Sequence, residues 1–314
     1  MLAVHLYWIV PALLIFAVSF YTQPASGHGL GGETLPPVKI AGKNATLSIF
    51  VTPPEFNSKN TEYNIALKLY ETNTQAIIPH VTYHVQISHD GKQLLDEKFH
   101  DDSSNLSFKV IPQNTDSIKM SGNDLGDLGW TSGFISPLQA EGPLFLSGGL
   151  YKFKIQILTV DDDSNKLSPP VNFDAAISLA QTTDHKISYE KNDYSLGIIS
   201  YYDKIGDFGF DSESRKISFS MPYEWTEKNI AQTNVVHEEI HIPKTFPEML
   251  VTKYDASVNG IKIPDSSVTV DDYTSDSRVI HLVLYQKQIS SMVNSITDKS
   301  KMIFTRSEEH TSEL

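Results

Sequence analysis

The run His237-Glu238-Glu239-Ile240-His241 gathers two imidazoles and two carboxylates, which are side chains that bind zinc or copper. On a helix, His237 and His241 would share a face, and Glu238 would be placed to activate a metal-bound water. On a strand, His237, Glu239 and His241 would share one face, and Glu238 and Ile240 would lie on the other. The local secondary structure therefore decides the chemistry of this motif.

The residues around the motif favour a strand. Val235 and Val236 precede it, and Ile242 and Pro243 follow, so apolar side chains alternate up to a proline that ends the segment. We predict a strand over residues 235–242, which leaves an H-E-x-x-H zinc metalloprotease as the least favoured alternative. A zinc or copper site on the shared strand face is a second alternative, and a solvated polar face is the simpler interpretation.

A second group of histidines lies near an expected hairpin. His80 and His84 are four residues apart on one predicted strand, and Asp90-Gly91 is a strong turn signal. His89 and His100 fall close to His80 and His84 if the chain pairs around that turn. A metal site centred on His80 and His84 is one interpretation, and ordinary surface or partly buried histidines are the other.

The N-terminus predicts export. An apolar run over residues 8–20 is followed by Pro24, and Ala25 and Gly27 occupy the −3 and −1 positions of a cleavage site. The run is short for a membrane span, which needs roughly 20 apolar residues. We therefore assign residues 1–27 to an export signal, with an uncleaved N-terminal anchor as the alternative.

Cleavage after Gly27 would leave His28 as the first residue of the mature chain. Its α-amino group and imidazole could chelate Cu(II) together. This arrangement resembles the histidine brace of copper monooxygenases and of some periplasmic copper carriers. The alternative is that His28 begins a flexible segment over residues 28–36, because Gly29, Gly31 and Gly32 follow it.

Acidic loops offer weak calcium candidates. They are Asp124 with Asp127, the run Asp161-Asp162-Asp163-Ser164-Asn165, and Asp271-Asp272. The second opens like an EF-hand loop, but Lys166 replaces the required glycine and no glutamate follows at the twelfth position. An EF-hand is excluded, which leaves weak calcium binding or solvated turns.

Composition narrows the class of protein. The 314 residues carry a formal net charge of −13, which disfavours nucleic acid and anionic lipid as partners and favours divalent cations. The chain has no cysteine, so thiol catalysis and cysteine-bound zinc are excluded, and a prokaryotic exported protein is indicated. No G-x-S-x-G, Walker A or dinucleotide glycine motif is present.

Short β-type runs separated by turn residues predict a mainly β chain of two Ig-like β-sandwich modules, over residues 37–182 and 183–305. Strands are expected at 47–51, 63–70, 81–87, 94–99, 108–111, 150–160, 171–179, 198–202, 216–221, 235–242, 250–254, 268–270 and 279–285. Two short helices are expected at 226–231, with Thr226 as the N-cap, and at 288–296.

The last nine residues, Arg306 to Leu314, read RSEEHTSEL, which matches the translation of a widely used sequencing-library adapter. We therefore expect the native sequence to run to about Thr305. A C-terminal membrane anchor or sorting segment in the missing part is compatible with this ending, so the lack of a C-terminal membrane helix in the sequence carries no weight.

Three segments carry a resemblance to known proteins: HGLGGETLPPV over residues 28–38, FLSGGLY over 145–151 and VHEEIHIPK over 236–244. Together they resemble exported surface proteins of marine ammonia-oxidising archaea (Nitrososphaerota, Nitrosopumilus-like), over most of residues 28–300. The resemblance implies a source and a location at the cell surface, and it implies no activity. Members often end in a PEF-type sorting segment with a membrane helix.

The expected function is that of an exported, non-enzymatic cell-envelope or surface protein with a structural, adhesive or ligand-binding role. Its partners would be envelope components or other surface proteins. The alternatives are an exported copper- or zinc-binding protein, using His28 or the His237/Glu239/His241 face, and the metalloprotease.

Overall fold

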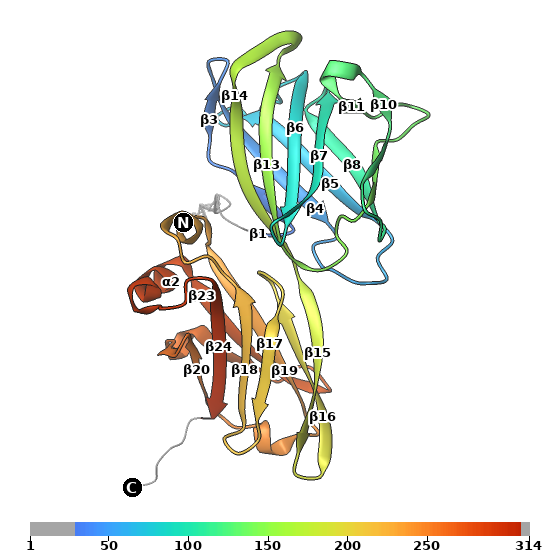
Figure 1. The fold of residues 1–314 in the computed structure, drawn as a ribbon. Helices are drawn as coiled ribbons and strands as arrows, with labels where there is room; N and C mark the ends of the chain where they lie inside the picture. Colours follow the sequence, from blue (N-terminus) through green and yellow to red (C-terminus); the bar gives the residue numbers. More distant parts are fainter. Residues whose placement is uncertain (1–28, 309–314) are drawn as a thin grey trace, which may run out of the picture.

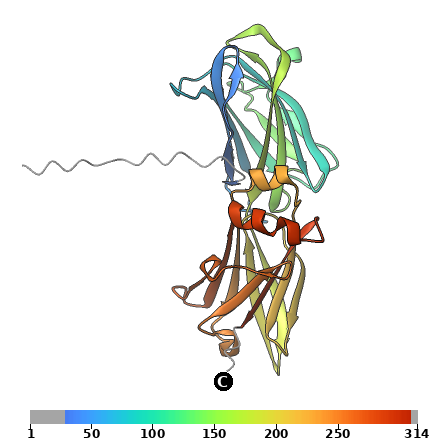
Figure 2. The same ribbon diagram turned by 90° about the vertical axis from the view of Figure 1, so that its left-hand side faces the viewer.

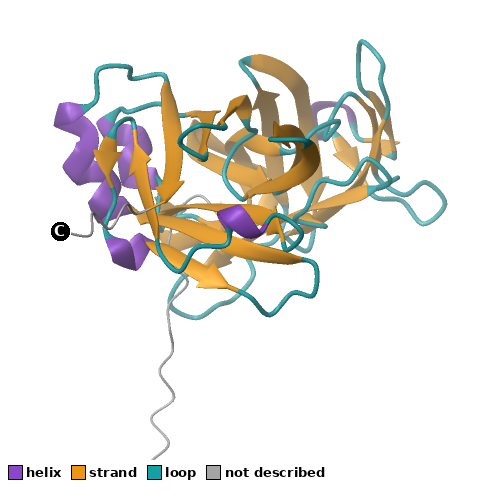
Figure 3. Ribbon diagram, turned by 90° about the horizontal axis from the view of Figure 1, so that it is seen from below, coloured by secondary structure: helices purple, strands orange, loops and turns teal. Residues whose placement is uncertain are grey.

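The computed structural model describes residues 29–308, and these form a mainly β protein with four sheets and few helices (Figure 1). The expected export signal and His28 lie outside the described residues. Seen from below, the helices are a few short pieces beside the strand layers (Figure 3). Within residues 29–308, none of the helices has the length and apolar character needed to cross a membrane.

The first two sheets are built from strands β1 to β14 and are called here the first sheet pair. One has the order β1-β14-β13-β6-β7-β11-β10, and the other has the order β2-β4-β5-β8-β12-β9 with β3 beside β4. The bounds are β1 Gly29–Leu30, β2 Gly32–Thr34, β3 Val38–Ile40, β4 Lys43–Thr52, β5 Tyr63–Glu71, β6 Val81–His89, β7 Lys92–Asp101, β8 Asn105–Pro112, β9 Lys119–Ser121, β10 Asn123–Asp124, β11 Trp130–Thr131, β12 Gln139–Gly142, β13 Gly149–Val160 and β14 Asp162–Leu179, with a 3₁₀ turn at Gly126–Leu128.

The other two sheets are built from β15 to β24 and are called the second sheet pair. Their orders are β15-β16-β19-β23-β22 and β17-β18-β24-β20-β21. The bounds are β15 Gln181–Tyr189, β16 Asn192–Ser200, β17 Gly206–Asp211, β18 Lys216–Pro222, α1 Glu227–Gln232, β19 Val235–Pro243, β20 Tyr254–Val258, β21 Ile261–Lys262, β22 Val268–Asp271, β23 Ser277–Tyr285, α2 Gln286–Met292 and β24 Lys301–Glu308, with 3₁₀ turns at Pro247–Met249, Asp265–Ser267 and Val293–Ser295.

Each sheet pair encloses its own apolar core. In the first pair, alternate residues of β6 point inward, and Phe99 of β7 stacks on Phe108 of β8 with ring centroids 4.6 Å apart. In the second pair, Phe219 of β18 stacks on Phe304 of β24 at 5.1 Å. Apolar and polar side chains alternate along these strands, so the apolar ones are buried in the core and the other strand face is polar.

Most of the expected elements are present. The turn at Asp90-Gly91 joins β6 to β7, and both residues have positive φ, as a two-residue hairpin of type I′ requires. Helix α1 begins where expected, and the Thr226 hydroxyl accepts a hydrogen bond from the Asn229 N–H at 3.2 Å. The predicted strand over 235–242 is confirmed as β19.

Other expectations fail. The predicted strand at 250–254 is wrong, because Pro247 starts a 3₁₀ turn that the Leu250 N–H closes, and β20 begins only at Tyr254. Strand β24, which sequence patterning missed, lies between β18 and β20 and continues past Thr305. Arg306 is fully buried there, with its guanidinium 4.0 Å from the ring centre of Tyr254.

No loop separates the two sheet pairs. Strand β14 ends at Leu179 and β15 begins at Gln181, so Ala180 alone lies between them. The Ala180 N–H donates to the carbonyl of Pro54, and its own carbonyl accepts from the Phe56 N–H. Helices α1 and α2 lie side by side at the junction of the sheet pairs (Figure 2). Pro54 and Phe56, in the loop before β5, therefore hold Ala180, the one residue between the two sheet pairs, through backbone hydrogen bonds.

Side chains also join the two pairs. Leu150 and Ala176, from the first pair, pack into the core of the second. Ion pairs cross the junction between Lys204 and Asp90, between Lys152 and Glu224 at 2.7 Å, and between Lys228 and Asp174 at 2.9 Å. The junction is therefore a packed apolar interface that three ion pairs also bridge.

Asp203 is the buried acid of this junction. Its Oδ1 accepts hydrogen bonds from the Leu150 N–H at 3.0 Å and from the Lys204 N–H at 2.8 Å. It lines a cavity of about 300 Å³ together with His89, Lys152 and other residues of both pairs. Burial raises the pKa of Asp203 to about 6 despite these hydrogen bonds.

The raised pKa predicts a pH dependence of stability. An unfolded aspartate has a pKa of about 3.9. The stability that protonated Asp203 contributes to the folded state is therefore complete below about pH 4, and it is lost as the pH rises through about 6. Asp203→Asn keeps the oxygen that accepts both N–H groups and removes the titration. Its free energy of unfolding at pH 7 should exceed that of the wild type by about 1 to 3 kcal/mol.

Urea unfolding at pH 4, 5, 6 and 7 measures this difference. Asp116→Asn is the control, because Asp116 is exposed. If Asp203→Asn and Asp116→Asn keep the same pH profile as the wild type, the buried carboxyl does not titrate as described.

Candidate metal centres

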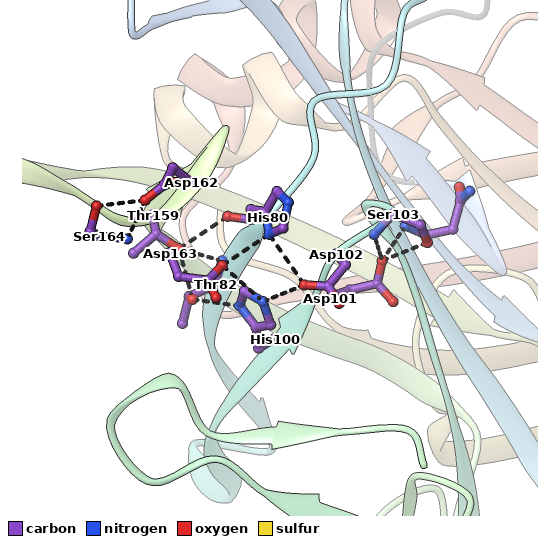
Figure 4. A network of polar contacts seen from close by, with 11 residues as sticks. His80, Thr82, His100, Asp101, Asp102, Ser103, Thr159, Asp162, Asp163 and Ser164 are labelled. Atoms are coloured by element: carbon purple, nitrogen blue, oxygen red, sulfur yellow. Dashed lines mark hydrogen bonds and ion pairs between the residues drawn. The ribbon is translucent and has the colours of Figure 1, made fainter. Parts of the chain in front are cut away.

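Two histidines and two aspartates meet at the end of the first sheet pair that lies away from the junction (Figure 4). His80 Nδ1 lies 3.2 Å from Asp102 Oδ1 and 3.0 Å from Asp163 Oδ1. His100 Nε2 lies 3.0 Å from Asp102 Oδ1 and 3.3 Å from Asp163 Oδ1. We call these four residues the distal cluster. Nitrogen and oxygen atoms alternate around it.

Strand pairing brings the members of the distal cluster together from three parts of the chain. Thr82 of β6 lies directly opposite His100 of β7, so His80 and Asp102 fall at adjoining strand ends. His80 precedes β6 with a φ of 51°, which turns it out of the strand alternation. Asp163 comes from the start of β14, just beyond the turn that follows β13.

Two buried threonines lie behind the distal cluster. His100 is only 3% exposed, and its Nδ1 lies 2.9 Å from the hydroxyl of Thr82. The hydroxyl of Thr159 lies 2.8 Å from that of Thr82 and 3.2 Å from the carbonyl oxygen of His80. A histidine that binds a metal through one nitrogen is commonly fixed by a hydrogen bond at the other, and Thr82 fills that role for His100.

The spacing of the distal cluster suits a small divalent ion. Metal–ligand distances of about 2.0 Å place the ligand atoms of a regular tetrahedron about 3.3 Å apart. The four nitrogen–oxygen distances lie between 3.0 and 3.3 Å, and all four atoms lie within 4.8 Å of one another. The cluster can therefore hold a small divalent cation with little rearrangement.

The three aspartates of the β13–β14 turn do not converge on one point. Asp161 forms an ion pair with Lys43 at 2.6 Å, and the Asp162 carboxylate accepts from the N–H and hydroxyl of Ser164. Only Asp163 faces the histidines. Asp124, at another expected calcium loop, caps the Gly126 N–H. Because these carboxylates face separate partners, the contacts do not support the calcium binding expected at these two loops.

His84 lies apart from His80. Its Nε2 is 2.5 Å from Asp96 Oδ1, and its Nδ1 is 3.0 Å from Gln156 Oε1. Desolvation acts to raise the pKa of Asp96, but hydrogen bonds from His84 and two glutamines hold it below its usual value. The structure therefore places the two histidines that the sequence paired in different surroundings, since His80 is not on the alternating face of β6.

A second group lies on the outer face of the second sheet pair. His237 Nε2 is 3.2 Å from His281 Nδ1, and Glu239 Oε1 is 3.7 Å from His237 Nε2 and 3.3 Å from His281 Nδ1. His241 Nε2 lies 3.0 Å from the other carboxylate oxygen, Oε2. We call His237, Glu239 and His281 the sheet-face cluster. The strand alternation of β19 puts His237, Glu239 and His241 on one face, as predicted.

Tyr201 covers one side of the sheet-face cluster. Its ring stacks on His237 with centroids 4.6 Å apart, and its hydroxyl donates to Glu239 Oε1 at 3.1 Å. Burial lowers the pKa of His237, and it raises the pKa of Tyr201 to about 12 with help from the Glu239 charge. Desolvation opposes ionisation of Glu239, but hydrogen bonds from His241 and Tyr201 keep its pKa below the usual value.

Glu238 points into the core on the opposite face of β19. It is completely buried, and Oε1 accepts from the Ser200 hydroxyl at 3.0 Å. Burial raises its pKa well above the usual value. In a strand Glu238 is on the far side of the sheet from His237 and His241, so the residues of the H-E-x-x-H motif lack the geometry that a metalloprotease requires.

Sequence reasoning missed Asp102, Asp163 and His281 as members of these clusters, and it named His100 only as a neighbour. These residues join the clusters through the pairing of distant strands. For example, Glu239 lies directly opposite His281 in the β19–β23 ladder. The expected strand at 279–285 contained His281, but nothing in the sequence showed which strand it would pair with.

Comparisons with known proteins give no relative. No protein-family model matches the chain, and neither a curated protein nor a solved structure is significantly similar to it.

The sheet-face cluster predicts a stability effect in the absence of metal. Glu239→Gln keeps the shape of the side chain and removes the charge that His237, His281 and His241 share. With a chelator present at pH 7, urea unfolding should show a loss of about 1 to 3 kcal/mol, because hydrogen bonds to charged groups contribute this much. Glu190→Gln is the matched control, because Glu190 is exposed. Equal stability of the two variants would contradict a structural role for the Glu239 charge.

Proposed function

We propose that the protein is an exported, non-enzymatic cell-surface protein of two Ig-like β-sandwich modules. In this proposal the first module binds a structural zinc ion through the distal cluster, His80, His100, Asp102 and Asp163. The observation that carries the zinc assignment is the convergence of two imidazole nitrogens and two carboxylate oxygens within 4.8 Å of one another.

The donor set favours zinc over the other candidates. Calcium takes six to eight oxygen ligands, whereas two of the four residues of the distal cluster offer imidazole nitrogens. Copper(II) prefers tetragonal geometry, whereas zinc has no electronic preference and accepts a tetrahedron of imidazole and carboxylate ligands. The mixed set of two imidazole nitrogens and two carboxylate oxygens is one that zinc takes.

The position of the distal cluster supports a structural role. A bound ion would tie the start of β6, the end of β7 and the β13–β14 turn to one another. All four tetrahedral positions would be filled by protein side chains, and closed zinc sites of this kind are structural, since catalytic ones keep a position open. This supports a non-enzymatic protein over a hydrolase.

Export and surface location rest on the sequence. The apolar run and cleavage-type residues within 1–27, and the resemblance to surface proteins of marine ammonia-oxidising archaea, both support them. Partners would be envelope components or other surface proteins, because the net charge of −13 disfavours nucleic acid. A zinc-stiffened module suits a protein that must hold its shape outside the cell.

Zinc retention tests the proposal. Measured in a His28→Ala background, the double variant His80→Ala/Asp163→Asn should retain about one equivalent of zinc less than its parent after dialysis. Zinc at 100 times its Kd should stabilise the parent by about 2.7 kcal/mol more than an unbound protein, and this gain should vanish in the double variant.

His84→Gln/Asp96→Asn is the matched control, because it removes a histidine–aspartate pair from the same sheet without touching the distal cluster. Equal zinc content in the parent, the control and the double variant would overturn the assignment. A zinc loss as large in the control as in the double variant would also overturn it, since it would report a general disturbance of the sheet.

A further inference from the structure

We infer that the sheet-face cluster is a second metal site, in which His237, Glu239 and His281 hold a copper(II) ion that keeps a coordination position open to a small anion. This site is separate from the distal cluster in position and in donor set. The inference does not rest on the zinc function proposed above.

The ligand atoms already converge. His237 Nε2, His281 Nδ1 and Glu239 Oε1 lie within 4.8 Å of one another, and the two nitrogens are 3.2 Å apart. All three side chains come from β19 and β23, two hydrogen-bonded strands inside one sheet. Residues on paired strands are held more firmly than residues on loops, so the three donors are prearranged.

Two neighbours orient the ligands of the sheet-face cluster. His241 Nε2 contacts Glu239 Oε2 at 3.0 Å, which leaves Oε1 turned toward His237 and His281. The Tyr201 ring stacks on His237 and restricts its rotation. Partners of this kind commonly contribute 10- to 100-fold in metal affinity, so His241 and Tyr201 are positioning residues of the site.

The sheet-face cluster leaves more of the coordination shell of a bound ion unfilled than the distal cluster does. Three protein atoms converge instead of four, and the side chains of His237 and His281 are 30% and 24% exposed. The imidazoles of His237 and His281 are therefore within reach of solvent. Solvent or a small anion can therefore reach a metal ion bound on this face.

The donor set points to copper. Two imidazole nitrogens and one carboxylate oxygen suit Cu(II), which binds a given nitrogen and oxygen site more tightly than the other divalent first-row metals. A sheet face blocks approach from one side only. It can therefore accommodate the four- or five-coordinate tetragonal geometry of Cu(II), with water completing the shell.

Copper titration followed by electron paramagnetic resonance tests the inference. The parent for this test carries His28→Ala, His80→Ala and Asp163→Asn, which removes the N-terminal chelate and the distal cluster. It should bind about one equivalent of Cu(II) with hyperfine coupling to two nitrogens. Added azide should change the spectrum, because it would enter the open position.

Two ligand variants and one orienting variant complete the test. His281→Ala and His237→Gln should each abolish the two-nitrogen signal, so the result stands if either variant folds. His241→Gln should lower the copper affinity by about 10- to 100-fold and keep the signal. His185→Gln, a histidine of β15 that stacks on Phe208, is the control and should match the parent.

Three results would overturn the inference: no retained copper in the parent, an unchanged signal in His281→Ala and His237→Gln, or a spectrum that azide leaves unaltered. None of them bears on the distal cluster, which the parent lacks. Failure of the copper site and failure of the zinc function are therefore distinguishable.

Discussion

The register of antiparallel pairing is the constraint on which the rest of this structure depends. Thr82 lies opposite His100 and Glu239 lies opposite His281, and each pair places chemically active side chains at fixed separation. A shift of one residue in either ladder would send these side chains to the opposite face of the sheet. The apolar residues that alternate with them, buried in two cores, hold the register in place.

Much of the fold is readable from local pattern. Alternation and turn chemistry identify β6, the Asp90-Gly91 turn and β7, and the same reasoning identifies β19 as a strand despite its H-E-x-x-H motif. The sites are readable only in part. His80 and His237 were visible as candidates, but their partners Asp163 and His281 are set by pairings between distant segments, which no local pattern encodes.

The two clusters place similar residues in different surroundings within one chain. In the distal cluster His100 is buried and contacts Thr82, whereas the side chains of His80, Asp102 and Asp163 are 42%, 76% and 48% exposed. The sheet-face cluster lies on an outer strand face beside the ring of Tyr201, and its side chains are 12% to 30% exposed. The two clusters therefore differ in the number of ligand atoms that converge and in which of their side chains are buried.

The direct passage of β14 through Ala180 into β15 has a mechanical consequence. A pull on the second sheet pair would be carried along the backbone into β14, which pairs with β13 over most of its length. Because the hydrogen bonds of that ladder run across the strands, the load would strain many of them at once, in shear, and not one after another. The junction would therefore transmit tension between the first and second sheet pairs with little extension.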